Sequence, residues 1–359
     1  MPLGNTSGFF SSKKYGNKMR TLLIESCEKK ITDASTSSIV HVRNSQVISK
    51  ALDFDFVSHQ SEIDAALENK YDTIICAYGS QYMKYDNYLR ILDNNLDAKL
   101  FWLVNDHDVE DNILLRKWLI KYNRPYHMIC NNPREGYRGW ILRKKMNGKT
   151  LNDWIDEWYT LNLNTLIFDE ELFYKTLNTK KSDVIYYGTF RKHRIKDMLD
   201  YNTASYFLST SKKNHVKYQA AGIDARYIDP IMWTDKESDL FDHTGCRLQD
   251  FKYSIYFEDE HTHKNYAFMA NRFYEAVMSN SLMLFDSRCS LVIEKCGYAI
   301  DPFQIVKDGD DLNEKVDQLN SDDDSYNHFL SIQQSNVPLI VKEKQDVLQR
   351  INQIAKLGN

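Results

Sequence analysis

Short apolar runs alternate along this chain with stretches of helical periodicity. In the first half, the apolar runs predict strands at 21–25, 54–58, 73–77 and 100–104, with a helix at about 38–52. The second half repeats this scheme, with strands predicted at 183–187, 205–209, 253–257 and 281–285 and a helix near 271–278. Such alternation is typical of parallel sheets with crossover helices. The pattern therefore predicts an α/β fold of two Rossmann-like domains in tandem.

The same pattern predicts where these units begin and end. Residues 147–181 form an aromatic, helical connection that ends in the polar run 178–182, a plausible hinge. The predicted units are 1–177 and 178–340, followed by a closing helix within 341–359. The acidic stretch 308–325 is expected to be turn-rich around a short helix. Two such units place the carboxyl ends of their strands across a central crevice, so binding residues should come from both halves.

Composition narrows the possible functions. The 359 residues are 42% hydrophobic, enough for two ordinary domain cores. The net charge of -4 argues against a general polyanion binder, so any nucleic-acid contact must be local. Six cysteines without a Cys-x-x-Cys pair argue against zinc ribbons and disulfide frameworks, and are expected to be reduced, mostly buried thiols. The first 18 residues lack the apolar region of a signal peptide, and no run reaches membrane-span length, so a soluble, cytoplasmic protein is expected.

The most informative segment is 183–194, where an apolar strand meets a glycine and then a run of cations. Gly188 permits close approach of the backbone to a ligand, and the start of a following helix offers free N–H groups to an anion. Arg191 and Arg194 could add forked hydrogen bonds to phosphate oxygens. The segment therefore predicts a diphosphate cradle. The alternative is a helix start with solvated basic residues.

A second candidate segment, 271–286, is a helix that leads into an apolar strand. Arg272 and Glu275 are three residues apart and share one helix face. Glu275 could accept both ribose hydroxyls of a nucleotide, and Arg272 could reach its phosphates or base. An exposed ion pair on a solvated helix is the alternative, because pairs at this spacing are common. The presence of the Gly188 turn in the same half favours the nucleotide site.

These segments together resemble the donor half of the bacteriophage DNA β-glucosyltransferases, which are two-domain GT-B enzymes that use UDP-glucose. The likeness rests on 183–191, on Arg272-Phe-Tyr-Glu275 and on 282–286. Residues 98–106 resemble the strand that delivers the family's catalytic aspartate. The resemblance implies that Asp106, with Asp108 as fallback, is the base that deprotonates an acceptor hydroxyl, a role worth ~10² to 10⁴ in rate. The alternative is that Asp106 caps the next helix, a role that Asp commonly fills.

On the donor side, the resemblance implies that Gly188, Thr189 and Arg191 hold the diphosphate of a UDP-sugar, with Arg272 alongside and Glu275 on the ribose. Transfer would invert the anomeric carbon without an obligatory cofactor or metal, although Mg²⁺ or Mn²⁺ could stimulate it. Arg194 departs from the family, whose second arginine lies four residues after the first instead of three. The family's acidic residue near 38–43 is also missing, so glucose, arabinose and other UDP-linked sugars stay open.

The implied acceptor is the hydroxymethyl group of a modified pyrimidine, of the 5-hydroxymethylcytosine type, in double-stranded phage DNA. The implied enzyme is monomeric and works in the cytoplasm of the infected host. An aromatic side chain in a basic segment could fill the gap left by a flipped base. A solvated basic loop with core-packed aromatics is an equal alternative. The candidate DNA contacts are Arg134, Arg138, Trp140, Arg143, Lys144 and Lys145.

Other functions stay open at this point. The run 258–263 contains two histidines and three carboxylates that could ligate a metal, but no further ligand is signalled, and a loop lining the site is favoured. The same donor site could serve a transferase that acts on lipopolysaccharide, capsule or another carbohydrate. A third possibility is a catalytically silent module that binds a nucleotide sugar or DNA.

Overall fold

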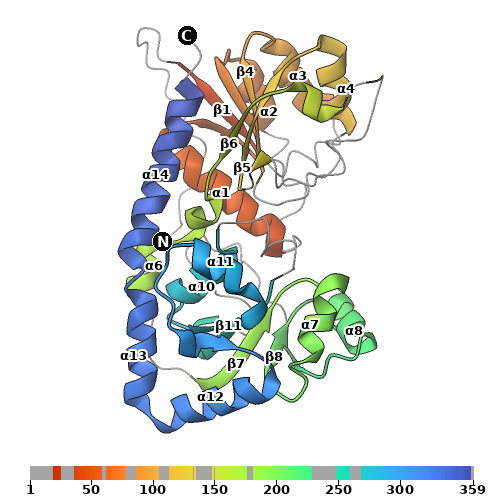
Figure 1. Cartoon of the computed structure of the whole chain (residues 1–359). Helices are drawn as coiled ribbons and strands as arrows, with labels where there is room; N and C mark the ends of the chain where they lie inside the picture. The colour runs from red at the N-terminus through yellow and green to blue at the C-terminus, as the bar shows by residue number, and fades with distance from the viewer. Residues whose placement is uncertain are drawn as a thin grey trace, which may run out of the picture.

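The structure is a computed structural model that describes residues 19–25, 36–58, 62–77, 86–104, 113–131, 133–134, 148, 150–175, 181–228, 248–258 and 268–356. Its backbone forms two six-stranded sheets, one from each half of the chain, in which every strand pair is parallel (Figure 1). Helices connect successive strands, as parallel pairing requires. The predicted α/β class with two Rossmann-like units is confirmed.

The first sheet has the strand order β2-β1-β3-β4-β5-β6. Its central strands are continuous apolar runs because helices cover both faces, so that every residue of β1 and β5 is buried. Two strands of this sheet were not predicted: β5, and β6, which falls inside the connection expected to be helical. The strands are β1 Thr21–Ile24, β2 Asp55–Val57, β3 Thr73–Cys76, β4 Lys99–Val104, β5 Tyr126–Cys130 and β6 Ile155–Thr160.

The second sheet has the strand order β12-β11-β10-β7-β8-β9. The chain runs outward from β7 in one direction and then returns to β10 on the other side of β7. This reversal between β7 and β10 is the topological switch point, where doubly wound sheets bind their ligands. The strands are β7 Lys181–Tyr187, β8 Phe207–Ser209, β9 Arg226–Ile228, β10 Phe251–Tyr256, β11 Leu282–Asp286 and β12 Ile305–Val306.

The helices include one correction to the sequence prediction. The stretch 308–325 is not a short helix among turns, because α12 alone has 13 residues and α13 follows it directly. No helix among the described residues is long and apolar enough to cross a membrane. The helices are α1 Thr36–Leu52, α2 Ile63–Leu67, α3 Asp86–Asn94, α4 Ile113–Tyr122, α6 Glu170–Lys175, α7 Ile195–Leu199, α8 Lys212–Ala220, α10 Asn271–Met278, α11 Ser290–Lys295, α12 Gly309–Ser321, α13 Asp323–Gln334 and α14 Val337–Lys356.

The last helix, α14, packs on both halves of the molecule. It begins four residues before the predicted position and runs along one side of the structure (Figure 1). Val337 and Ile340 enter the apolar core of the second sheet, whereas Ile351 and Ile354 enter that of the first. The Thr73 hydroxyl on β3 donates to the carbonyl of Ala355, at 2.9 Å. α14 therefore ties the two sheets together.

The segment that joins the two halves also contacts both. Asn162 donates to the Tyr274 hydroxyl on α10 at 2.9 Å, and to the Glu343 carboxylate on α14 at 3.2 Å. Arg43 on α1 forms an ion pair of 3.0 Å with Asp169. The predicted boundary at 177/178 lies outside the described residues and stays a prediction.

Candidate functional site

The turn after β7 is held in place by its neighbours. The Gly188 N–H donates to the Ser209 carbonyl at 3.2 Å, and the Gly188 carbonyl accepts from the Thr210 hydroxyl at 2.7 Å. The next carbonyl, that of Thr189, accepts from the Tyr218 hydroxyl on α8 at 3.1 Å. Because β8 and α8 fix both carbonyls, the path of this turn does not depend on a ligand.

Gly188 is needed for space and not for an unusual backbone angle. Its φ lies outside the left-handed region, but a Cβ at this position would lie 3.1 Å from the Tyr186 hydroxyl and 3.3 Å from Nη2 of Arg272. Such contacts are tighter than most real Cβ contacts. The glycine therefore lets the guanidinium of Arg272 lie directly against the turn.

The sequence predicted that the cations after this turn begin an α-helix, and that prediction is wrong. Lys192–Arg194 form a 3₁₀ turn, and α7 then has only five residues. Arg191 is exposed, whereas Arg194 is buried. The two arginines therefore do not present one shared basic face, and the interpretation of Arg194 as a solvated cation is wrong.

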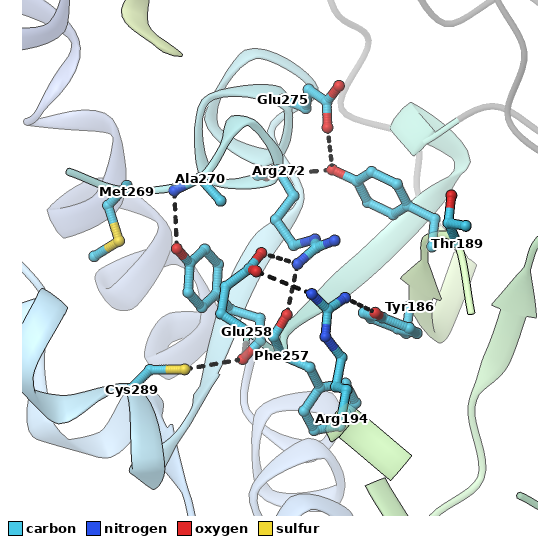
Figure 2. Close-up of polar contacts among 12 residues, drawn as sticks. Tyr186, Thr189, Arg194, Phe257, Glu258, Met269, Ala270, Arg272, Glu275 and Cys289 are labelled. Atoms are coloured by element: carbon cyan, nitrogen blue, oxygen red, sulfur yellow. Dashed lines mark hydrogen bonds and ion pairs between the residues drawn. The ribbon is translucent and has the colours of Figure 1, made fainter. Parts of the chain in front are cut away.

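Arg194 and Arg272 meet at one carboxylate, Glu258 (Figure 2). Nη2 of Arg194 lies 3.1 Å from the Glu258 carboxylate, and Nη1 of Arg272 contacts its other oxygen. Nη1 of Arg194 also donates to the Tyr186 hydroxyl at 2.5 Å, and Nη1 of Arg272 donates to the Phe257 carbonyl at 2.5 Å. The side chains of Arg194, Glu258 and Arg272 are only 6%, 7% and 13% exposed, so this is a buried charge cluster.

Counted over the described residues, this cluster carries more positive than negative charge. Burial by itself lowers the pKa of Arg272, but attraction to Glu258 outweighs it and holds that pKa above its ordinary value. The rings of Tyr186 and Tyr187 lie 5.4 and 6.0 Å from the same guanidinium. With two guanidiniums and one carboxylate, the cluster can attract an anion.

Glu275 lies one helical turn after Arg272 on α10, and it is buried. The Tyr187 hydroxyl donates to Oε2 of Glu275 at 2.6 Å. Burial raises the pKa of Glu275 above 4.5, and the hydrogen bond from Tyr187 opposes that shift. The exposed-pair alternative for Arg272 and Glu275 is therefore wrong, and Glu275 is an oriented carboxylate that can accept further hydrogen bonds.

All of these residues gather at the switch point of the second sheet. Gly188 follows β7 and Glu258 follows β10, and these two strands pair with each other. The carboxyl edge of the first sheet is linked to the same region, because Asn131 after β5 donates to Asn164 at 3.0 Å and Asn164 donates to the Met269 carbonyl at 2.8 Å. Met269 lies just before α10, so the two carboxyl edges approach each other there.

The other predicted site residues are only partly described. Asp106 and Asp108 lie outside the described residues, although β4, which precedes them, ends beside Cys130 of β5. Arg134 is exposed, and it donates to Asn152 at 3.3 Å. The remaining DNA candidates also lie outside the described residues: Arg138, Trp140, Arg143, Lys144 and Lys145.

The metal alternative gains no support from the part of the chain that the structure describes. There, no group of three or more His, Cys, Asp or Glu could hold a metal ion. His261 and His263 lie outside the described residues, and Glu258 is occupied by the two arginines. Cys76, Cys130, Cys289 and Cys296 are reduced thiols, as expected.

Sequence reasoning missed three residues that shape the site. Tyr187 is the last residue of β7 and orients Glu275, while Glu258 neutralises part of the arginine charge. Glu25 follows β1 at the switch point of the first sheet, where it is fully buried and accepts from the Ser45 hydroxyl at 2.9 Å. A signal existed for Glu25 alone, which is a single charge that closes an apolar strand run.

Comparison with solved structures identifies the architecture. A mutant of the T4 phage β-glucosyltransferase in complex with UDP-glucose matches with a TM-score of 0.66 and 15% identity, over 94% of this chain and 100% of that one. The chain has the GT-B fold. The T4 protein is a DNA modifying enzyme, and a further T4 structure with the GT-B fold, containing UDP and Mn²⁺, matches with a TM-score of 0.64 and 14% identity over the same shares.

A second GT-B neighbour comes from a different organism. The Anabaena protein HepE in complex with UDP and glucose matches with a TM-score of 0.51 and 11% identity, over 94% of this chain and 100% of that one. No protein-family model and no curated protein matches the sequence. These neighbours are bound to UDP or UDP-glucose. The predicted donor class, a UDP-sugar, agrees with the ligands of these structures.

Proposed function

We propose that this chain is an inverting glycosyltransferase that moves a sugar from a UDP-sugar to the hydroxymethyl group of a modified pyrimidine in phage DNA. The observation that carries the proposal is the buried Arg194–Glu258–Arg272 cluster beside Glu275, at the switch point of the second sheet. The T4 phage enzyme binds UDP-glucose in a molecule of the same fold. In this proposal the second half of the chain, 178–340, is the donor domain.

The donor site would work mainly through charge. The diphosphate would lie against Gly188, Thr189 and Arg191, with Arg272 alongside. As UDP departs, negative charge grows on its terminal phosphate, and fixed guanidiniums stabilise that charge more in the transition state than in the ground state. Glu275 would accept from the ribose hydroxyls. A divalent ion such as the Mn²⁺ of the T4 structure would add to this neutralisation without being obligatory.

The first half, 1–177, would form the acceptor site. Asp106, or Asp108 in its place, would be the base. The carboxylate takes the proton of the acceptor hydroxyl while its oxygen bonds to the anomeric carbon. The bond from that carbon to the phosphate oxygen breaks, and UDP leaves with the electron pair. This in-line displacement converts a UDP-α-sugar into a β-linked product. The chain would act as a monomer in the cytoplasm of the infected host.

One observation favours a second candidate acceptor. The GT-B neighbour from Anabaena contains UDP and glucose, and it comes from an organism that is not a phage. The same donor site could therefore serve a carbohydrate acceptor in place of DNA. A silent nucleotide-sugar or DNA-binding module is the third candidate.

The deciding experiment offers labelled UDP-glucose and UDP-arabinose with three acceptors: hydroxymethylated duplex DNA, the same duplex unmodified, and an oligosaccharide mixture. We expect transfer only to the hydroxymethylated duplex, and loss of transfer in Asp106→Ala. Transfer to the oligosaccharides alone would refute the DNA acceptor. UDP binding without any transfer, unaffected by Asp106→Ala, would indicate the silent module. Glu275→Ala should lose UDP binding while keeping the fold, as measured by calorimetry and circular dichroism.

A further inference from the structure

A cluster of cations covers the outer side of α7 and α8. It consists of exposed side chains that we call the α7–α8 surface: Lys192, Lys196, Lys212, Lys213 and Lys217. Residues 191–217 hold seven Lys and Arg against two Asp, whereas the whole chain has 46 Lys and Arg against 50 Asp and Glu. Positive charge is therefore concentrated here in a chain that is acidic overall.

The fold places these side chains on one continuous face. β7, β8 and β9 are neighbours in that order, so right-handed crossovers put α7 and α8 on the same side of the sheet. Met198 on α7 and Tyr218 on α8 share one apolar core, and Figure 1 shows the two helices next to each other. The two acidic residues do not neutralise the lysines, because Arg288 binds Asp197 at 3.0 Å and Asp200 at 2.9 Å.

The lysines at the start of α8 do not stabilise their own helix. Lys212 and Lys213 occupy its first turn, which contains no acidic residue, so their charges oppose the helix dipole. Neither forms an ion pair with any residue that the structure describes. Without an ion-pair partner among the described residues, these two ammonium groups are available to an anion outside the protein.

The α7–α8 surface adjoins the candidate donor site. The Tyr218 hydroxyl on α8 donates to the Thr189 carbonyl, and the rings of Phe190 and Tyr218 lie 5.1 Å apart. The ammonium of Lys217 lies 5.8 Å from the Phe190 ring. The surface thus continues outward from the Gly188–Phe190 turn.

We infer that the α7–α8 surface binds the phosphate backbone of the acceptor duplex. The inference rests on the proposed DNA acceptor and adds a contact region in the donor half of the chain, separate from the basic segment 134–149. Duplex DNA carries one negative charge per ~1.7 Å of its axis, and exposed lysines are suited to such contacts because they need no fixed geometry. A duplex held here would bring a flipped base toward the carboxyl edge of the second sheet.

The test is the salt dependence of binding to an unmodified 30-base-pair duplex. Each lysine that contacts a phosphate contributes about 0.9 to the slope of log K against log salt concentration. For Lys212→Gln/Lys213→Gln we expect a slope shallower by about 2, and binding weaker by roughly 5- to 10-fold per lysine at 0.1 M salt. The matched control is Lys342→Gln/Lys356→Gln, which removes the same charge from exposed positions on α14. Its slope should equal that of the wild type.

The dissociation constant for UDP separates this surface from the donor site. It should be unchanged in the Lys212/Lys213 variant, because those side chains point outward in our proposal. If UDP binding weakens together with DNA binding, the lysines belong to the donor site and the inference is overturned. If the Lys212/Lys213 variant binds DNA with an unchanged slope, the inference is overturned and the proposed DNA acceptor still stands. A wild-type chain that binds no duplex at any salt concentration would refute the DNA acceptor itself, and the inference with it.

Discussion

Glu258 pairs with two buried guanidiniums at once, so replacing it is the most direct perturbation of the site. The three side chains are 6%, 7% and 13% exposed, so solvent cannot replace the carboxylate without a rearrangement. In Glu258→Ala, Arg194 and Arg272 would keep their charge and lose this carboxylate. Their remaining bonds to Tyr186 and to the Phe257 carbonyl satisfy hydrogen-bond donors but supply no negative charge.

The expected loss of stability follows from this arrangement. Removing one partner of a buried ion pair costs about 3–5 kcal/mol, and we expect the lower end because the neutral partners of both arginines remain. Typical proteins are stable by about 5–15 kcal/mol, so the variant should still fold. Glu258→Gln keeps the volume and one acceptor oxygen and should lose less.

The assay is urea denaturation with and without UDP. A ligand at 100 times its dissociation constant stabilises the folded state by about 2.7 kcal/mol. If the diphosphate lies at this cluster, it supplies part of the charge that Glu258→Ala removes, so UDP should stabilise the variant more than the wild type. The control is Asp346→Ala, which breaks an exposed ion pair with Lys342 of 2.6 Å and should change little.

Two results would refute this reasoning. A Glu258→Ala variant that unfolds at the wild-type urea concentration would mean that the cluster does not contribute to stability. A variant that is destabilised but gains less from UDP than the wild type would mean that the diphosphate binds elsewhere.

The remaining predictions concern the neighbours of this cluster. Burial raises the pKa of Glu275, and ribose binding needs its ionised form, so UDP affinity should fall as the pH drops toward that pKa. Tyr187→Phe removes the hydrogen bond that lowers this pKa and should move the fall in affinity to higher pH. Calorimetry across pH that shows no shift would contradict this prediction. Gly188→Ala should weaken UDP binding at least several-fold, since its Cβ would displace a guanidinium; unchanged affinity would show that the turn is not a close approach. Arg191→Ala should weaken UDP binding without loss of stability, whereas Arg194→Ala, at a buried position, should lower the unfolding midpoint; equal midpoints would refute this distinction.

Elements with continuous apolar cores could be predicted from the sequence. β3 and β1 were predicted to within one residue, and α10 was predicted with its observed bounds, because each has a strong pattern of its own. β6 could not be recognised, since Ile155–Thr160 reads Ile-Asp-Glu-Trp-Tyr-Thr and gains its strand geometry by pairing at the edge of the sheet. β12 has only two residues and depends likewise on its neighbour, β11.

The site could be predicted only where its residues are close in sequence. Arg272 and Glu275 lie on one helix, so their spacing predicts a shared face. Glu258 lies 64 residues from Arg194, and the two meet only because β10 pairs with β7. Nothing in the local pattern distinguishes such a carboxylate from one in an acidic loop, which is why the metal alternative was open.

The short 3₁₀ turn after Gly188 explains how one run of cations contains both a buried and an exposed arginine. In a regular 3₁₀ helix, residues three apart lie above one another, so Arg191 and Arg194 would share a face if both belonged to the turn. Arg191 is instead the extended residue before it, with φ of -127° and ψ of 116°. Its side chain is exposed, whereas that of Arg194 is buried against Glu258. A single extended residue thus divides the cations between an inner charge cluster and an outer face, and both remain beside the same glycine turn.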